Sequence, residues 1–332
     1  MRARLLAIGI LCTLIAACDG AGSVARSGGS VLPTNVGRSQ SILAGDAAPW
    51  KIFPLRHNAA PGSVAVGPRG KIWFTDDDPV SGVSKIGRIF EDGHADEFAL
   101  QKDSDPQDIV EGPDGNMWFT EYSSSKVGRI TPTGLVSEFS PPSSGQPIHI
   151  TVGPDGALWF TEPSGGQVGR ITTGGQITEF PVPAVGITTG PDSNLWVTTG
   201  HGTIDRMTTT GTVTEFKTHF DARPNDIVAG PDGKLWFVQW RPHTGYAIGR
   251  MTTTGVLKEY PLAGQIVTGL TSAYGNVWFT VMTSTGSGVA SIDPHGVITE
   301  HLLQSQGVYD LVLAPDGNIW FSYGSAIGVY TP

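Results

Sequence analysis

The sequence predicts an all-β fold built from one repeated unit, and three observations lead to this prediction. Gly and Pro are frequent, with 45 and 24 copies among 332 residues, about a fifth of the chain against about one eighth on average. A Trp recurs at intervals of 37 to 45 residues. Short runs of β-forming residues alternate with Gly, Pro, Asp and Ser clusters, as in strands joined by tight turns. Together they indicate a seven-bladed β-propeller of four-stranded blades.

The repeated unit is marked by a Gly-Pro-Asp-Gly turn that precedes an aromatic strand. The turn is clearest at 112–115, 153–156 and 230–233. Variants of it stand at 67–70, 190–193, 272–275 and 314–317. The recurring aromatic residues are Trp73, Trp118, Trp159, Trp196, Trp236, Trp278 and Trp320. A period near forty residues is found in four-stranded propeller blades and in helical pairs.

Each unit contains four β-type runs, which decides between these two architectures. In the second unit the runs are 108–110, 117–120, 127–130 and 135–139, separated at hairpin spacing. No stretch places apolar residues at helical spacing over ten or more positions, so helical repeats are excluded. Seven units of four strands therefore form the predicted propeller.

The two ends of the repeat predict how the ring closes. The seventh unit stops at Tyr330 without a fourth strand, while residues 50–55 ahead of the first unit resemble that strand. We expect this N-terminal strand to complete the last blade and close a ring over residues 48–332. Closure removes the exposed end strands that an open array would leave for aggregation.

The N-terminus has the pattern of an exported lipoprotein. Residues 1–17 join Arg2 and Arg4 to an apolar run too short to span a membrane, which predicts a signal peptide. Residues 15–18 (Ile-Ala-Ala-Cys) resemble the bacterial lipobox, so we expect Cys18 to be lipidated. The Gly-, Ser- and Ala-rich remainder of residues 18–47 has the composition of a flexible linker. The alternative is an ordinary secretory signal that leaves Cys18 as a free thiol.

These features predict a monomeric protein of the cell envelope, on the periplasmic face of a bacterial membrane. Asp19 resembles the residue that retains lipoproteins at the inner membrane of enteric bacteria, which favours that membrane. The formal charge of −9 offers no basic footprint for a phosphate backbone, so nucleic acid is not an expected partner. No phosphate-binding loop or G-x-S-x-G motif is present, so nucleotide use and serine hydrolysis have no support.

Three repeated side chains are expected to be structural because they recur in step with the blades. The Trp is expected to fill the space between neighbouring sheets rather than to form a ligand cage. Charged partners are expected from the Gly-Arg motif and from the Glu before an aromatic residue. The arginines are Arg88, Arg129, Arg170, Arg206 and Arg250, and the glutamates are Glu97, Glu138, Glu179, Glu215 and Glu259.

The whole unit, P-x-x-I-x-x-G-P-D-G-x-L-W-F-T-E followed by K-V-G-R-I-T-x-x-G and I-T-E-F, resembles the streptogramin lyases. That resemblance implies a propeller that opens a cyclic depsipeptide by elimination, with a bound Mg²⁺, two histidines and a Glu. Counted blade by blade, Val267 and Tyr309 occupy the two histidine positions, and the Glu falls at Tyr323 or Gly324. The required chemistry is absent at these positions, so the sequence predicts that the family's mechanism is not retained.

Other polar residues vary from blade to blade and are candidates for a ligand site. The start of the innermost strand and the end of the second strand lie on the same face of the propeller, because the two strands are antiparallel neighbours. We therefore expect side chains at these two places to meet at the channel mouth. The candidates are Asp76, Asp108, Glu121, His149, Glu162, Asp226 and Asp310. Oxygen ligands from Asp108, Glu121 and Glu162 would suit Mg²⁺, and a carboxylate beside His149 could act as a base. The alternative is that these acids accept backbone hydrogen bonds at strand ends.

Three functions remain open on this evidence. The first is a lipid-anchored module that binds a small molecule or peptide at the channel mouth. The second is a Mg²⁺-dependent streptogramin-type C–O lyase with a relocated active site. The third is a passive scaffold. The sequence favours the binding module because the family's catalytic positions carry other residues.

Overall fold

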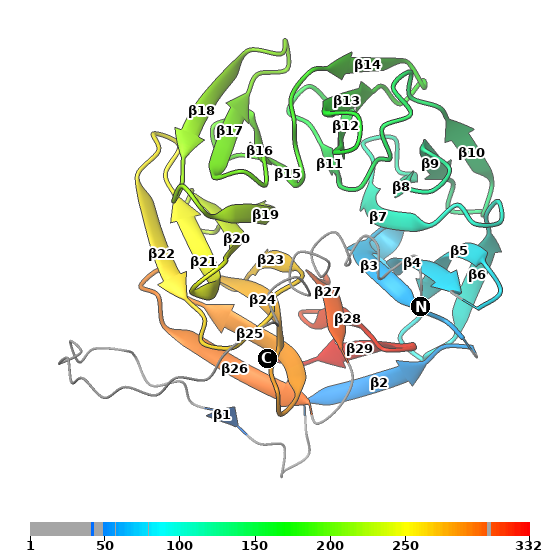
Figure 1. Ribbon diagram of the computed structural model, residues 1–332. Coiled ribbons are helices and arrows are strands. Elements are labelled where there is room, and N and C mark those ends of the chain that lie inside the picture. Colours follow the sequence, from blue (N-terminus) through cyan, green and yellow to red (C-terminus); the bar gives the residue numbers. More distant parts are fainter. Residues whose placement is uncertain (1–40, 43–48, 57, 79, 304–306) are drawn as a thin grey trace, which may run out of the picture.

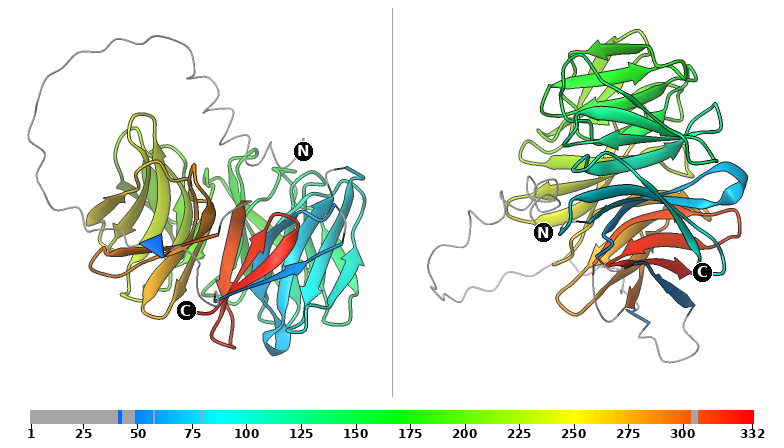
Figure 2. Two further views of the ribbon diagram at one scale, coloured as in Figure 1. Left: turned by 90° about the horizontal axis from the view of Figure 1, so that it is seen from below. Right: turned by 90° about the vertical axis from the view of Figure 1, so that its right-hand side faces the viewer.

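The computed structural model confirms the seven-bladed propeller. It describes residues 41–42, 49–56, 58–78, 80–303 and 307–332. Seven sheets surround a central channel, each with its first strand innermost and its fourth strand outermost (Figure 1). Seen from the side, the blades stand next to one another as twisted sheets (Figure 2). All pairings within the blades are antiparallel, as expected for consecutive hairpins.

The first four blades follow one another along the chain. Blade 1 contains β3 (Pro61–Val66), β4 (Ile72–Asp78), β5 (Val83–Ile89) and β6 (Ala95–Ala99). Blade 2 contains β7 (Pro106–Glu111), β8 (Met117–Glu121), β9 (Lys126–Ile130) and β10 (Val136–Phe139). Blade 3 contains β11 (Ile150–Val152), β12 (Leu158–Glu162), β13 (Gln167–Ile171) and β14 (Ile177–Phe180). Blade 4 contains β15 (Ile187–Thr189), β16 (Leu195–Thr198), β17 (Thr203–Met207) and β18 (Val213–Lys217).

The last three blades complete the ring. Blade 5 contains β19 (Arg223–Ala229), β20 (Leu235–Arg241), β21 (Gly245–Met251) and β22 (Leu257–Pro261). Blade 6 contains β23 (Leu270–Ala273), β24 (Asn276–Met282), β25 (Ser287–Ile292) and β26 (Ile298–Leu303). Blade 7 contains β27 (Val308–Leu313), β28 (Ile319–Tyr323) and β29 (Ala326–Tyr330), with β2 (Trp50–Pro54) as its fourth strand. The register of β2 against β29, from Trp50 opposite Tyr330 to Pro54 opposite Ala326, confirms the predicted closure.

The repeated Trp packs between blades, as predicted. Five of the seven are at most 1% exposed, and Trp278 and Trp320 are 4% exposed. Each ring stacks on an aromatic side chain of the fourth strand in its own blade. The stacking partners, in blade order, are Phe98, Phe139, Phe180, Phe216, Tyr260, His301 and Phe53, with ring centroids 5.1 to 5.9 Å apart. His301 therefore takes an aromatic packing position, and Phe53 supplies that position in blade 7 from the N-terminal strand.

The Asp of the Gly-Pro-Asp-Gly turn links the Trp to the repeated Arg, which confirms the structural role predicted for that charge. In blade 3, Asp155 accepts a hydrogen bond from Trp159 Nε1 at 2.9 Å and one from Arg170 Nε at 2.6 Å. Blade 5 repeats the arrangement around Asp232. Blade 1 has Arg69 in place of this Asp, and Trp73 Nε1 there has no hydrogen-bond partner.

Two blades depart from the common pattern at the middle of the sheet: blade 6, where Ala290 lies opposite Phe279, and blade 4. In blades 1, 2, 3, 5 and 7 a Gly on the third strand lies under the Phe that follows the Trp, so a Cβ there would come within 2.3 Å of the ring. Blade 4 has the smaller Val197 at the Phe position and Asp205 at the Gly position, opposite each other across β16 and β17. The smaller Val leaves room for the Asp side chain. Burial raises the pKa of Asp205.

The segment ahead of the ring contributes one more strand. Ser41–Ile42 (β1) pairs in parallel with β26 on the outer edge of blade 6, where backbone groups of an edge strand are available. These two residues fall within the predicted linker. The predicted signal peptide and Cys18 lie outside the described residues. The described residues contain no helix with the length and hydropathy needed to cross a membrane.

Candidate functional site

The candidate site lies at one end of the central channel, here called the upper face. The innermost strand of each blade starts on this face, and the antiparallel second strand ends there. The innermost residues form a ring with one member from each blade. The ring consists of Ser63, Asp108, His149, Gly186, Asp226, Thr268 and Asp310.

A buried hydroxyl two residues after the Trp holds most of this ring in place. In blade 2, Thr120 Oγ1 accepts a hydrogen bond from the Asp108 N–H at 3.1 Å and donates one to the Ile148 carbonyl of blade 3 at 2.6 Å. In blade 3, Thr161 does the same between the His149 N–H and blade 4. Each hydroxyl thus joins its own innermost strand to that of the next blade. The backbone positions of Asp108 and His149 are fixed in this way.

Four ring residues form a continuous polar arc, which we name the channel arc: Asp310, Ser63, Asp108 and His149. The Ser63 hydroxyl lies 2.8 Å from Asp310 Oδ2 and 2.9 Å from Asp108 Oδ1, so it bridges blades 7 and 2. Asp108 Oδ2 lies 3.7 Å from His149 Nδ1. Asp226 belongs to the same ring, and its charge acts on His149. The arc offers an imidazole, a hydroxyl and carboxylate oxygens to the channel.

Each of the three aspartates also links its own blade to the next blade in the ring. Asp108 Oδ2 accepts the Ile150 N–H, Asp226 Oδ2 accepts the Leu270 N–H, and Asp310 Oδ2 accepts the Val64 N–H, all at 2.9 Å. This supports the structural alternative for these acids, because each accepts a backbone hydrogen bond at the start of a strand. His149 has no such backbone role among the described contacts of its side chain. It is therefore the arc residue most available to a ligand.

The environment of the ring shifts its proton equilibria. Burial alone would lower the pKa of His149, but the nearby carboxylate of Asp108, with the charges of Asp226 and Asp310, raises it. Burial and the charge of Asp108 raise the pKa of Asp310 to about 7. Burial raises the pKa of Asp226 to about 6. The charges of the ring thus favour the protonated imidazole of His149, and Asp310 is partly protonated at neutral pH.

The three predicted acids of the second strands do not join this arc. Asp76, Glu121 and Glu162 are at most 1% exposed, so their side chains are closed to solvent. Asp76 accepts the Ala60 N–H at 2.6 Å, whereas Glu162 accepts from Ser143 and Gly145. The structure therefore brings together Asp108 and His149, with Asp226 and Asp310, and separates them from the other candidates. A ligand role for the separated acids stays a prediction.

The predicted Mg²⁺ ligands lie in three different environments. Asp108 contacts Ser63 and Ile150, while Glu121 and Glu162 have other neighbours in blades 2 and 3. Within the part of the chain that the structure describes, no group of three or more His, Cys, Asp or Glu side chains is placed to hold a metal ion. The set Asp108, Glu121 and Glu162 is thus not assembled as one site.

Comparison with known proteins places the chain in a family. A family model described as the virginiamycin B lyase family matches residues 37–267 and 184–330, which is most of the chain. The protein belongs to the virginiamycin B lyase family. No curated protein matches it significantly.

Solved structures of this family resemble the chain over its propeller. A streptogramin B lyase is 29% identical, with a TM-score of 0.76, over 84% of this chain and 96% of that one. Virginiamycin B lyase from Staphylococcus aureus is 31% identical, with a TM-score of 0.76, over 85% and 99% of the two chains. A catalytically inactive variant of that enzyme with quinupristin is 30% identical, with the same TM-score and coverage.

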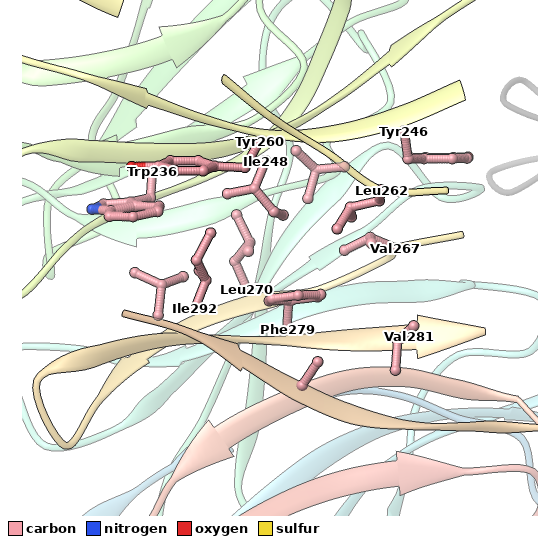
Figure 3. Packing of buried hydrophobic residues seen from close by; sticks show 13 residues of the cluster. Trp236, Tyr246, Ile248, Tyr260, Leu262, Val267, Leu270, Phe279, Val281 and Ile292 are labelled. Carbon is pink, nitrogen blue, oxygen red and sulfur yellow. The ribbon is translucent and has the colours of Figure 1, made fainter. Parts of the chain in front are cut away.

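The positions that the sequence matches to the family's catalytic residues carry side chains of different chemistry here. Val267 is 2% exposed and packs with Leu262, Tyr246 and Val281 in an apolar cluster between blades 5 and 6 (Figure 3). Tyr309 is partly exposed at the start of β27, and Gly324 has no side chain. A valine, a phenol and a glycine do not fit the hard oxygen and nitrogen ligands of Mg²⁺. That the family's mechanism is not retained at these positions stays a prediction.

Sequence reasoning left Ser63 out of its candidates, although this residue bridges two of them. A serine at the start of an innermost strand carries no charge and gives little signal by itself. The order of the ring residues could have identified it, because Ser63 stands between Asp310 and Asp108 once the ring is closed.

Proposed function

We propose that this protein binds a small molecule or peptide at the upper mouth of its channel, without the ring-opening chemistry of its relatives. The observation that carries the proposal is the channel arc, in which His149 and Asp108 lie 3.7 Å apart and partly exposed while Val267 is part of the core. The side chains of His149 and Asp108 are 29% and 24% exposed, so both remain accessible. The arc presents polar side chains, whereas the position of Val267 presents an apolar one.

The charges of the arc suit a ligand with several hydrogen-bonding groups. The nearby aspartates raise the pKa of His149, which favours its charged, hydrogen-bond-donating form beside the Asp108 acceptor. The Ser63 hydroxyl and the partly protonated Asp310 add groups that both donate and accept. Amide and hydroxyl groups of a peptide or depsipeptide match this set. The relative with quinupristin makes a cyclic depsipeptide the first ligand to test.

A streptogramin-type lyase with a relocated active site is the second candidate, favoured by Asp310. A base works best when its pKa lies near the working pH, and the pKa of Asp310 is about 7. Proton abstraction beside the ester would be its task, and His149 would donate a hydrogen bond to the developing oxyanion. Because Asp310 Oδ2 already accepts from Ser63 and Val64, binding remains the first proposal.

We also propose that the propeller is a monomer held at the periplasmic face of the inner membrane through lipidated Cys18. The basic and apolar segment of residues 1–17, the small residues before Cys18 and the following Asp19 support this placement. The linker would leave the upper face free to meet a diffusing ligand. Mass spectrometry of the membrane fraction would show an acylated Cys18, and a Cys18→Ala variant would be released as soluble protein.

Quinupristin is expected to bind the wild-type protein saturably and to remain intact. His149→Ala and Asp108→Asn should each weaken binding about tenfold, the loss of roughly 1.4 kcal/mol that one charged hydrogen bond supplies. Isothermal titration measures the affinity, with His243→Ala as the matched control because that histidine is exposed on another loop. Chromatography follows ring opening with and without Mg²⁺, since elimination leaves the mass unchanged. Turnover that disappears in Asp310→Asn would establish the lyase candidate instead.

A further inference from the structure

Two glutamates of blade 3 lie together on one side of the sheet. Glu162 is opposite Gln167, and Phe160 is opposite Gly169, which in turn is opposite Glu179. Side chains two residues apart along a strand share a face, so Glu162, Gln167 and Glu179 project to the same side. This side faces blade 2 and the loop that follows β10.

That loop holds one oxygen of each carboxylate. The Ser143 N–H donates to Glu179 Oε1 at 2.9 Å, and the Ser143 hydroxyl donates to Glu162 Oε1 at 3.0 Å. The Gly145 N–H donates to the same Glu162 oxygen at 3.2 Å. A Cβ at Gly145 would come within 2.8 Å of the Glu162 Cβ, so the loop fits closely over the carboxylate. Both glutamates are thus fixed in position.

The second oxygen of Glu162 is left without a donor. Glu162 is 0% exposed, and its Oε2 has no hydrogen-bond partner. Ser143 contacts both carboxylates, and burial, together with the charge of Glu179, raises the pKa of Glu162, so a second carboxylate lies near the buried one. Two carboxylates this close repel each other unless a cation or a proton lies between them.

In three other blades a Lys or Arg side chain forms an ion pair with the Glu of the fourth strand. Lys85 pairs with Glu97 at 3.0 Å in blade 1, and Lys126 pairs with Glu138 in blade 2. Arg241 pairs with Glu259 in blade 5. Lys85 and Lys126 stand at the start of the third strand, opposite Asp76 and Glu121.

Blade 3 has lost this cation. Gln167 occupies the position of the two lysines, opposite Glu162. Among the described residues, neither Glu162 nor Glu179 takes part in an ion pair. In blade 3 the uncharged amide of Gln167 thus stands where blades 1 and 2 have a lysine. In this same blade both carboxylates are held in position, and Oε2 of Glu162 is buried without a hydrogen-bond donor.

We propose that blade 3 binds a Ca²⁺ ion between Glu162 and Glu179, in place of the lysine side chain that blades 1 and 2 supply. Ca²⁺ takes six to eight oxygen ligands in flexible geometry, and two carboxylates can provide up to four of them. The Ser143 hydroxyl, which contacts Glu162, is a further oxygen beside the two carboxylates. Mg²⁺ fits less well because it requires a regular octahedron and retains several waters, for which a closely covered carboxylate leaves little room. The site is separate from the channel arc and does not depend on the proposed ligand binding.

Isothermal titration of the chelator-treated protein with CaCl₂ alone tests this proposal. We expect one Ca²⁺ per chain, with a dissociation constant in the range of about 10 µM to 1 mM. The melting temperature should rise as free Ca²⁺ exceeds that constant, because only the folded protein brings the two glutamates together. MgCl₂ should bind at least tenfold more weakly. Equal affinity for Mg²⁺ would overturn the assignment to Ca²⁺.

Three substitutions separate the site from general effects on folding. Gln167→Lys restores the side chain of blades 1 and 2, and it should abolish Ca²⁺ binding while raising the melting temperature in chelator. Glu162→Gln should abolish binding as well. Glu121→Gln changes the same position in blade 2 and should leave Ca²⁺ binding intact. Binding that persists in Gln167→Lys and Glu162→Gln, or no binding by the wild-type protein, would overturn the proposal.

Discussion

Glu121→Gln is expected to stabilise the protein by about 3 kcal/mol at pH 8 and to change its stability little near pH 4. The side chain is 0% exposed, and neither of its carboxylate oxygens has a hydrogen-bond partner of good geometry. Burial, together with the charge of Glu138, raises the pKa of Glu121 from 4.5 to about 7. The folded state therefore binds a proton more tightly than the unfolded state does.

The sign of the pH dependence follows from that difference. Below pH 4.5 Glu121 is protonated in both states and costs little, whereas between pH 4.5 and 7 the unfolded chain ionises first and the folded state loses stability. Above pH 7 the full cost is present, and glutamine avoids it at every pH. Urea unfolding at several pH values measures the effect. Glu91→Gln is the control, because Glu91 is exposed, and it should show no such pH dependence. An advantage of Glu121→Gln that does not change with pH would contradict this account.

The fold could be predicted from sequence because its determinants are local and repeated. Where a Trp, a turn Asp and a third-strand Arg occur together, all three come from one blade, as with Trp159, Asp155 and Arg170. The strand pattern is recognisable because it occurs in seven imperfect copies. The seventh copy lacks a fourth strand, which identifies residues 50–55 as that strand. The departures in blade 4 could not be foreseen in the same way, because Asp205 fits only where Val197 has made space.

The candidate site was predicted less completely, for a physical reason that Glu121 illustrates. Glu121 follows Phe119 by two residues, so both side chains project from the same face of β8. Phe119 is buried between blades, and Glu121 is buried with it rather than facing the channel. The end of the second strand does lie on the upper face, but the direction of the side chain is set by the alternation along the strand. Applied to the buried Phe, that alternation would have separated Glu121 and Glu162 from His149.

Residues of the innermost strands were predicted correctly as neighbours because every blade presents them at the same level. Asp108 and His149 come from adjacent blades and meet across one interface. Asp108 is linked to Asp310 through Ser63, and this link depends on ring closure, which brings blade 7 beside blade 1. The sequence predicted the closure, and the order of the ring residues places Ser63 between the two acids, but an uncharged serine gave no signal of its own.

Phe53→Ala is expected to lower the free energy of unfolding by about 3 to 5 kcal/mol, the usual cost of removing a large buried aromatic side chain. Phe53 is 7% exposed and stacks on Trp320 with ring centroids 5.8 Å apart. It also lies at the seam with blade 1, where a Cβ at Gly93 would come within 2.5 Å of its ring. One side chain of the N-terminal strand thus packs against both blades that the closure joins.

The effect should exceed that of a matched substitution elsewhere because closure of the whole ring depends on this contact. Phe220→Ala removes the same atoms from a side chain that is 89% exposed, and it should change stability by less than about 0.5 kcal/mol. Urea unfolding of both variants, followed by Trp fluorescence, measures the difference. Separation of β2 from β29 would expose the edge of β29 and the face of Trp320, so Phe53→Ala should also aggregate more readily on heating. Equal stability of the two variants would mean that backbone pairing of β2 alone closes the ring.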